Sequence, residues 1–472
     1  MATVKIDQFG GIAPRQHPTL LADGMAVTAH NCRLVSGKLV PLRKPGTANV
    51  KVYLENGLNK SADAKSIHVW RKQDGTFDIL AFPGVTWAAN GNIADDDFTR
   101  IIISGDTDGD GKAEEPVVYA RRTSLGRETV ETLVLSKDAL PKPVARRKAG
   151  VLDPSDKTAT HRFTCFFLTW VDRYGYESPV SDPSDEIEYY DGDAIVIDPV
   201  GVGNIPSDAV SVRVYKVVAG TEEGRIQFIE ERRKFDLGNG AYGMEFKVKD
   251  ENAGEVIPEI ESPPRDLTCI HEVPGAFYCG FSPSAPKTVC FSDINLIYSW
   301  PLAYRYDVGD NLKALAVTSN TVYALTDGWP YVLSGTAPES MTVAKLAGPA
   351  ACVSERGVCV FRNAVYFVSN VGLMSIFNSA DAGTVCQNLT EKYFSKDQWL
   401  AFNPESAVMW QYDGTLYISF EPQEGGTKGL CVNLMENAQI AVTTHGVRVE
   451  CVAVDNATDR KYFVGSLAGE EA

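Results

Sequence analysis

Apolar and polar residues alternate along most of the chain, in short runs bounded by Gly, Asn, Asp and Pro. A period of two residues is typical of β-strands that bury one face, whereas an amphipathic helix needs apolar residues three and four positions apart. Helical spacing is almost absent from this sequence. The pattern therefore predicts an all-β protein built from antiparallel strands.

The C-terminal half repeats one strand pattern, as "NTVYALTD" from Asn320 and "NAVYFVSN" from Asn363 show. Related runs place a tyrosine at Tyr278, Tyr323, Tyr366, Tyr417 and Tyr462, which are 45, 43, 51 and 45 residues apart. A four-stranded antiparallel blade with its turns takes about 40–50 residues, and blades bury their faces only by stacking around a common axis. The spacing predicts a β-propeller.

Two upstream runs resemble the same unit, "GTFDILAF" near Phe77 and "EPVVYARR" near Tyr119. With two candidate blades before the period is interrupted and five after it, we expect about seven blades. The alternative is a β-sandwich whose short strands happen to be evenly spaced.

Residues 158–256 interrupt the repeat of about 40–50 residues that predicts the blades. They contain the long alternating runs "HRFTCFFLTW" and "AVSVRVYKVV", and segments rich in Pro and charged residues flank them. A length of about 100 residues fits an immunoglobulin-like or fibronectin type III-like sandwich. We therefore predict an extended N-terminal arm (1–45), a first part of the propeller (46–157), an inserted sandwich (158–256) and the remainder of the propeller (257–472).

Composition excludes some classes of function. The formal net charge of −16 argues against nonspecific binding to duplex DNA, which depends on Lys and Arg displacing counterions. The start "MATVKIDQFGG" has no apolar leader core, and no run approaches the length of a membrane span, so we expect a protein made in the cytosol. The ten cysteines include no C-x-x-C pair; we expect free buried thiols, with disulfides or a zinc site as alternatives.

Local catalytic motifs are missing. The six histidines form no H-E-x-x-H or H-x-H set, and the chain has no G-x-S-x-G elbow, phosphate loop or dinucleotide fingerprint. We expect no enzyme and no cofactor. The rival is a propeller-type glycoside hydrolase, which needs two carboxylates a few ångströms apart. Its candidate carboxylates are the acidic clusters at Asp95 to Asp97, Asp106 to Glu115, and Glu421 with Glu424, although solvated loops are the preferred interpretation of these clusters. Trp329 and Trp410 would form its sugar platform, although packing between blades is the preferred interpretation of both.

The stretch "DTDGDGKAEE" resembles a calcium loop. Asp106, Asp108 and Asp110 have the spacing of alternate ligands, but the twelfth position, where a helix-loop-helix site needs Glu, is Val117. Glu114, at the ninth position, fits the shorter loops between strands of integrin-type propeller blades. Neutralisation by Lys112 and the turn-forming glycines favour a plain inter-strand turn. Asp106, Asp108, Asp110 and Glu114 are therefore the candidate metal ligands, and a plain turn is the preferred interpretation.

The N-terminal segment carries a pattern of Gly, Pro, Leu, Ala, Asn and Arg positions, namely Gly10, Gly11, Pro14, Arg15, Leu20, Leu21, Gly24, Ala26, Ala29, Asn31, Gly37, Leu39, Pro41, Leu42 and Arg43. This pattern resembles a signature of tailed-bacteriophage virion proteins, the propeller-containing tail tubular or nozzle family of short-tailed phages. "ILAFPG", "ADDDFTRIIISGD" and "FLTWVDRYGYESPVSDPS" are also similar to that family. Where its members carry "Y-x-T-G-D-G-x-P", this chain has the longer "IISGDTDGDGKAEEP", so the calcium-like pattern is a local elaboration.

The resemblance implies a structural subunit of a phage tail. Such proteins form a ring, usually of six copies, that extends the DNA exit channel below the portal and adaptor. Its neighbours would be the adaptor and the tail fibres or spikes, genomic DNA would pass without sequence-specific binding, and the site of action would be the virion after assembly in the host cytoplasm. The alternative function is a receptor- or glycan-binding tail or adhesin module that uses the inserted sandwich.

Overall fold

The computed structural model describes residues 9–35, 38–43, 45–91, 96–124, 127–148, 161–190, 193–197, 205–218, 225–233, 244–247, 253–379, 383–421, 427–434, 440–455 and 457–466. Within these ranges, no helix is both long and apolar enough to span a bilayer. The chain divides into two compact units. Unit 1 comprises Met1–Thr132, Arg265–Asn295 and Ala303–Ala472, and unit 2 comprises Leu133–Pro264 and Leu296–Leu302.

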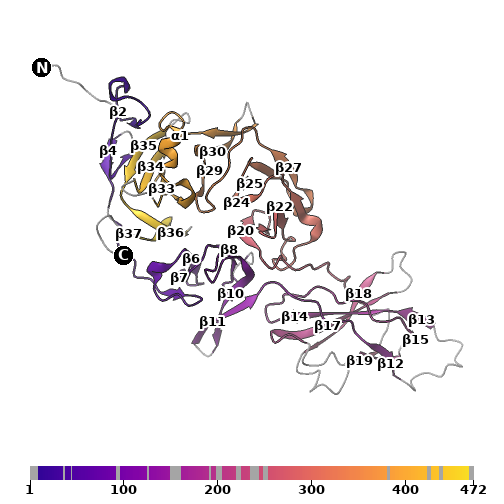
Figure 1. Cartoon of the computed structure of the whole chain (residues 1–472). Helices are drawn as coiled ribbons and strands as arrows, with labels where there is room; N and C mark the ends of the chain where they lie inside the picture. Colours follow the sequence, from indigo (N-terminus) through magenta and orange to yellow (C-terminus); the bar gives the residue numbers. More distant parts are fainter. Residues whose placement is uncertain are drawn as a thin grey trace. The chain divides into compact units, whose positions relative to one another are not determined.

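Unit 1 is a propeller. In its described part, seven sheets follow one another around a ring (Figure 1). Their strands are β5 (Val52–Leu54), β6 (Ser66–Arg71) and β7 (Phe77–Phe82); β8 (Thr86–Asn90), β9 (Ile101–Gly105), β10 (Glu114–Ser124) and β11 (Arg127–Val134); β20 (Thr268–Val273), β21 (Phe277–Ser282), β22 (Ala285–Phe291) and β23 (Arg305–Asp307); β24 (Leu312–Thr318), β25 (Thr321–Thr326), β26 (Tyr331–Ser334) and β27 (Thr342–Lys345); β28 (Val358–Phe361), β29 (Ala364–Ser369), β30 (Gly372–Ser379) and β31 (Gly383–Asn388); β32 (Val408–Tyr412), β33 (Thr415–Ser419), β34 (Gly429–Leu434) and β35 (Ile440–His445); β36 (Arg448–Asp455) and β37 (Arg460–Ser466).

The ring closes through one strand of each sheet. β20, β24, β28, β32, β36, β6 and β8 contact one another in this order, and β8 contacts β20. The C-terminal sheet β36–β37 therefore lies beside the N-terminal sheet that contains β6. This closure confirms the predicted propeller and its predicted number of about seven blades.

The repeated tyrosines mark the second strand of five successive sheets, namely β21, β25, β29, β33 and β37. Every residue of β21, β29 and β33 is buried, because sheets pack against both faces of these strands. Upstream, Phe77 begins β7, which is also a second strand, but Tyr119 lies on β10, the third strand of its sheet. The resemblance of "EPVVYARR" to the repeat therefore located the right sheet and the wrong strand.

The described part of unit 2 contains three small sheets. They are β14 (Phe166–Asp172), β17 (Ala209–Val217) and β18 (Ile226–Arg233); β12 (Ala145–Arg147), β16 (Ala194–Ile197) and β19 (Met244–Lys247); and β13 (His161–Thr164) with β15 (Ile187–Tyr190). One core cluster joins them, with Phe166, Ile195 and Val214 fully buried. The unit extends on both sides of the predicted range 158–256, and residue 158 lies outside the described residues. An immunoglobulin- or fibronectin-like topology stays a prediction.

Short elements complete the chain. The N-terminal segment contains β1 (Gly11–Ile12), β2 (Met25–Ala26), β3 (Cys32–Val35) and β4 (Lys38–Pro41). The helical turns are η1 (Pro18–Leu20), η2 (Ser61–Asp63), η6 (Leu302–Tyr304), η7 (Pro338–Ser340), η8 (Pro404–Ser406) and the α-helix α1 (Lys396–Leu400). Ser395 and Gln398 form a capping box that begins α1.

Candidate functional site

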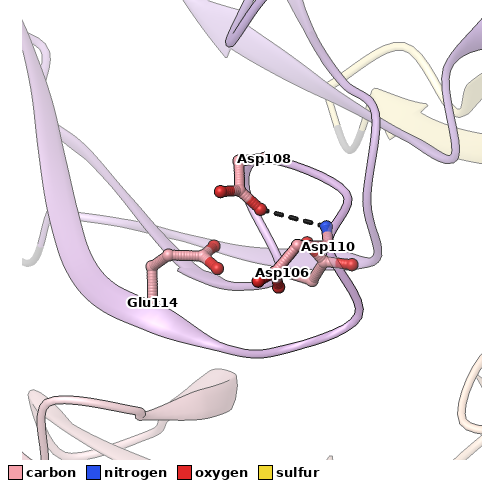
Figure 2. Close-up of side chains that lie close together, drawn as sticks. All are labelled: Asp106, Asp108, Asp110 and Glu114. Carbon is pink, nitrogen blue, oxygen red and sulfur yellow. Dashed lines mark hydrogen bonds between the residues drawn. The ribbon is translucent and has the colours of Figure 1, made fainter.

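The acidic loop connects β9 to β10, the second and third strands of one blade. Asp106, Asp108, Asp110 and Glu114 each offer a carboxylate oxygen, and these four atoms lie within 4.8 Å of one another (Figure 2). Asp108 and Asp110 are exposed, whereas Asp106 and Glu114 are partly buried. The structure thus brings together all four candidate ligands that the sequence predicts.

The loop uses these carboxylates to bind its own backbone. Asp106 Oδ1 accepts a hydrogen bond from the Gly109 amide at 2.6 Å, and its Oδ2 accepts one from the Gly111 amide at 3.1 Å. Asp108 Oδ1 accepts from the Asp110 amide at 3.0 Å (Figure 2). Glu114 Oε2 accepts from the Thr107 hydroxyl at 2.9 Å. These are the bonds of a tight acidic turn.

The backbone of the loop needs its glycines. Gly109 has φ +85° and Gly111 has φ +86°, values that L-residues with a side chain rarely adopt. Lys112 Nζ lies 4.0 Å from Asp110 Oδ2, and both side chains are well exposed, so water screens this pair. The geometry is compatible with a divalent cation, and it is equally that of a turn held by its own amides.

In the other two acidic clusters, one carboxylate each forms an ion pair with an arginine. Asp96 binds Arg100 through Nε at 2.8 Å, and the two side chains are only 9% and 6% exposed. Glu421 Oε1 lies 3.2 Å from Arg448 Nη1. Asp95 and Glu424 lie outside the described residues.

The two candidate tryptophans pack within unit 1. Trp329 lies against the core cluster of the β20–β31 blades, with Lys345 Nζ 4.2 Å from its ring centroid. Trp410 stacks on Tyr417, with ring centroids 5.5 Å apart and an interplanar angle of 11°.

A cysteine and a histidine meet in the propeller core. Cys269 Sγ lies 3.5 Å from His271 Nε2. Burial raises the pKa of the Cys269 thiol and lowers the pKa of His271 to about 4. A nucleophilic cysteine needs a lowered thiol pKa, because the thiolate is the reactive form. We therefore interpret Cys269 and His271 as residues that pack in the core.

The N-terminal arm, defined here as the described residues from Phe9 to Arg43, packs on the sheet β32–β35. Ala29 O accepts a hydrogen bond from the Thr444 amide at 2.9 Å, and the Asn31 amide donates to Thr444 O at 2.8 Å. Farther along, the Thr443 hydroxyl donates to Cys32 O at 2.6 Å. β35 is the outer strand of its blade, so the arm covers an edge that could otherwise pair with another strand.

The signature positions make several of these contacts. Gly11 has φ +94°, and a Cβ there would lie 2.5 Å from the Val442 amide nitrogen, so only glycine fits against β35. The Arg15 amide donates to Tyr393 O at 3.0 Å. Asn31, with φ 53°, accepts a hydrogen bond from the Gly446 amide through Oδ1 at 2.9 Å.

The capping-box residue Gln398 completes the attachment, because its side-chain amide donates to Pro14 O at 3.1 Å. The sequence identified Pro14 and its neighbours but not their partners, which lie 384 residues away on α1 and more than 400 residues away on β35. No local signal marks such partners. The signature position Gly37 lies outside the described residues.

Comparison with known proteins gives no family model and no curated protein that matches the sequence. Among solved structures, the chain is similar to AztD from Citrobacter koseri (10% identity, TM-score 0.29, covering 64% of this chain and 76% of that one). It is also similar to virginiamycin B lyase from Staphylococcus aureus (9% identity, TM-score 0.29, 79% and 93% covered). A third is a quinonprotein alcohol dehydrogenase-like protein from Bacteroides thetaiotaomicron (7% identity, TM-score 0.27, 80% and 86% covered). At these identities, the likeness says nothing of an activity.

Proposed function

We propose that this chain is a structural subunit of a bacteriophage tail, forming a nozzle or tail-tube ring of about six copies that extends the DNA exit channel. The attachment of the N-terminal arm to its own blade is the observation that supports this proposal. The residues by which its sequence resembles the nozzle family include those that attach it to the blade, among them Gly11, Arg15 and Asn31.

The exposed side of the arm supports contacts between subunits. Leu20, Val27 and Leu39 are 76%, 50% and 48% exposed although they are apolar. All three lie on the arm, which other residues attach to the sheet β32–β35. Exposed apolar side chains are typical of protein interfaces when they form a patch. We infer that these side chains contact the next copy in the ring.

The ring would act through its shape and charge. A conduit for DNA works best when its wall does not bind phosphate, because each Lys or Arg bound to the backbone would slow the passage of DNA. The net charge of −16 fits such a wall. The adaptor and the tail fibres or spikes would be the neighbouring proteins.

Native mass spectrometry of the purified full-length chain tests assembly. We expect a closed oligomer of about six copies, and Leu20→Ser should shift the population toward monomer. The matched control is Leu302→Ser, which changes an apolar residue that is 61% exposed and lies outside the arm. A wild-type chain that stays monomeric at every concentration, or equal effects of the two variants, would contradict the proposed interface.

A further inference from the structure

Unit 2 buries a lysine against an aspartate. Lys137 Nζ lies 2.8 Å from Asp172 Oδ2, and their side chains are 2% and 0% exposed. A second carboxylate is close, because Asp208 Oδ2 lies 3.9 Å from the same Nζ. Lys137 follows β11, Asp172 ends β14, and Asp208 directly precedes β17. Three separate segments of unit 2 therefore bring an amine and two carboxylates together, with Asp208, whose side chain is 27% exposed, beside the buried pair.

The contact between Nζ and Oδ2 is close without being a well-formed hydrogen bond. Neither Lys137 Nζ nor Asp172 Oδ2 has a hydrogen-bond partner of acceptable geometry within the described part of the chain. The other oxygen is well satisfied: Asp172 Oδ1 accepts from the amides of Tyr174 at 2.8 Å and Tyr176 at 3.0 Å. The Trp170 ring also lies close to the amine, with its centroid 4.5 Å from Lys137 Nζ.

We propose that Lys137 and Asp172 form an intramolecular isopeptide bond, with Asp208 as the proton-transfer group. Lys137 gives one proton to Asp208, which passes it to Oδ2 of Asp172, and the neutral amine attacks Cγ of the resulting carboxylic acid. The negative charge that develops on Oδ1 is stabilised by the two amide donors, as in an oxyanion hole. The attacking nitrogen then gives a second proton to Oδ2, the Cγ–Oδ2 bond breaks, and water leaves.

The step balances without any other reactant. An ammonium and a carboxylate become a neutral amide and one water molecule, and Asp208 returns to its starting state. Two effects favour it at this place. A buried ion pair keeps a desolvation cost that a neutral amide does not have. The folded unit also holds the reacting groups together, which can raise an effective concentration to the order of 10⁵ M or more.

An exposed pair provides an internal comparison. Lys142 Nζ lies 2.7 Å from Asp185 Oδ1, a distance like that of the buried pair, but these side chains are 50% and 91% exposed. Water solvates both charges there, because neither side chain is buried. We expect Lys142 and Asp185 to remain unlinked.

Intact mass spectrometry of the denatured full-length chain tests the proposal. The wild-type mass should be lower than the mass of the sequence by one water molecule. After digestion with trypsin, residues 128–146 should be found linked to residues 163–173, because an amidated Lys137 is no longer cleaved. Lys137→Arg should restore the mass expected for its sequence, whereas Lys142→Arg should keep the loss of water.

Two results would overturn the assignment. One is a wild-type mass that equals the mass of the sequence. This measurement does not depend on whether any variant folds. The other is a loss of water that maps to a single linear peptide, as an internal cyclisation at an Asp-Gly site would give. The role of Asp208 has its own test: Asp208→Asn should slow linkage by a factor on the order of 10². Linkage at the wild-type rate would remove Asp208 from the mechanism.

Discussion

The second strands of the propeller blades in unit 1 and the core of unit 2 differ in what they bury. Strands such as β21 and β29 are buried along their whole length, and their apolar sequence recurs from blade to blade. Buried ion pairs of unit 1, such as Arg121 with Asp78, lie outside these two strands. In unit 2, an apolar cluster around Phe166 and Val214 is accompanied by charged side chains such as Asp193 and Lys216, which are fully buried. The stability gained from apolar burial scales with the buried area, whereas a buried charge depends on one particular partner. We therefore expect strands such as β21 and β29 to be most sensitive to lost apolar volume, and the core of unit 2 to be sensitive also to the loss of a single charge.

The largest effect is expected in the propeller. Phe367 on β29 is fully buried in the cluster shared by neighbouring blades. Phe367→Ala should lower the free energy of unfolding by about 3–5 kcal/mol, because it removes buried surface and leaves a cavity. Val360→Ala is the control, since Val360 is 42% exposed. Chemical denaturation measures both, and equal losses would contradict the packing described for β29.

A comparable loss in unit 2 should follow from removing one charge. Glu177 accepts hydrogen bonds from Tyr215 Oη and Arg213 Nη1, each at 2.7 Å, and its side chain is 4% exposed. Glu177→Ala should cost roughly 3 kcal/mol, because it leaves the buried Tyr215 hydroxyl without its acceptor and removes one of the two carboxylates that bind Arg213.

Hydrogen exchange should locate the Glu177→Ala effect in peptides of unit 2. Asp185→Ala, at a position 91% exposed, should cost less than about 1 kcal/mol. If both variants exchange like wild type, unit 2 does not depend on its buried charges.

Acid should weaken the propeller through a neutral histidine. His445 on β35 is 1% exposed, and burial lowers its pKa to about 4 from an ordinary value of 6.5. The unfolded chain therefore binds more protons than the folded chain between these two values, and stability falls as the pH drops through that window. At about pH 5 this residue should account for a loss of about 2 kcal/mol.

His445→Gln isolates that contribution, because glutamine stays neutral and can still donate to Ile418 O, which the ring contacts at 3.1 Å. Denaturation at about pH 7.5 and about pH 5 should show a smaller pH difference for the variant than for wild type. An unchanged difference would mean that His445 titrates normally in the fold.

The smallest effect is expected at the acidic loop. The amides of Gly109 and Gly111 already bind Asp106, so the loop needs no ion to hold its shape. Calorimetry with Ca²⁺ should detect no saturable binding tighter than about millimolar. Saturable binding that disappears in an Asp108→Asn, Asp110→Asn double variant would show that the loop is a calcium site.

The fold and the candidate site could be predicted from the sequence where the information was local or repeated. The tyrosine period predicted the propeller, and the acidic cluster was visible because its four residues lie within nine positions. The sequence did not show that Tyr119 lies on the third strand of its blade, since that run has the same alternation as a second strand. Lys137, Asp172 and Asp208 could not be grouped beforehand, because nothing in their local sequences shows that three segments converge.

Electron microscopy of purified virions tests the proposed ring in a phage tail. We expect a ring of about six copies below the portal and adaptor, with density in each copy for a propeller of seven sheets like unit 1. We also expect Leu20 and Leu39 of the arm to lie against the next copy. A virion that lacks this chain, or carries it as single copies at the tips of fibres, would rule out the ring.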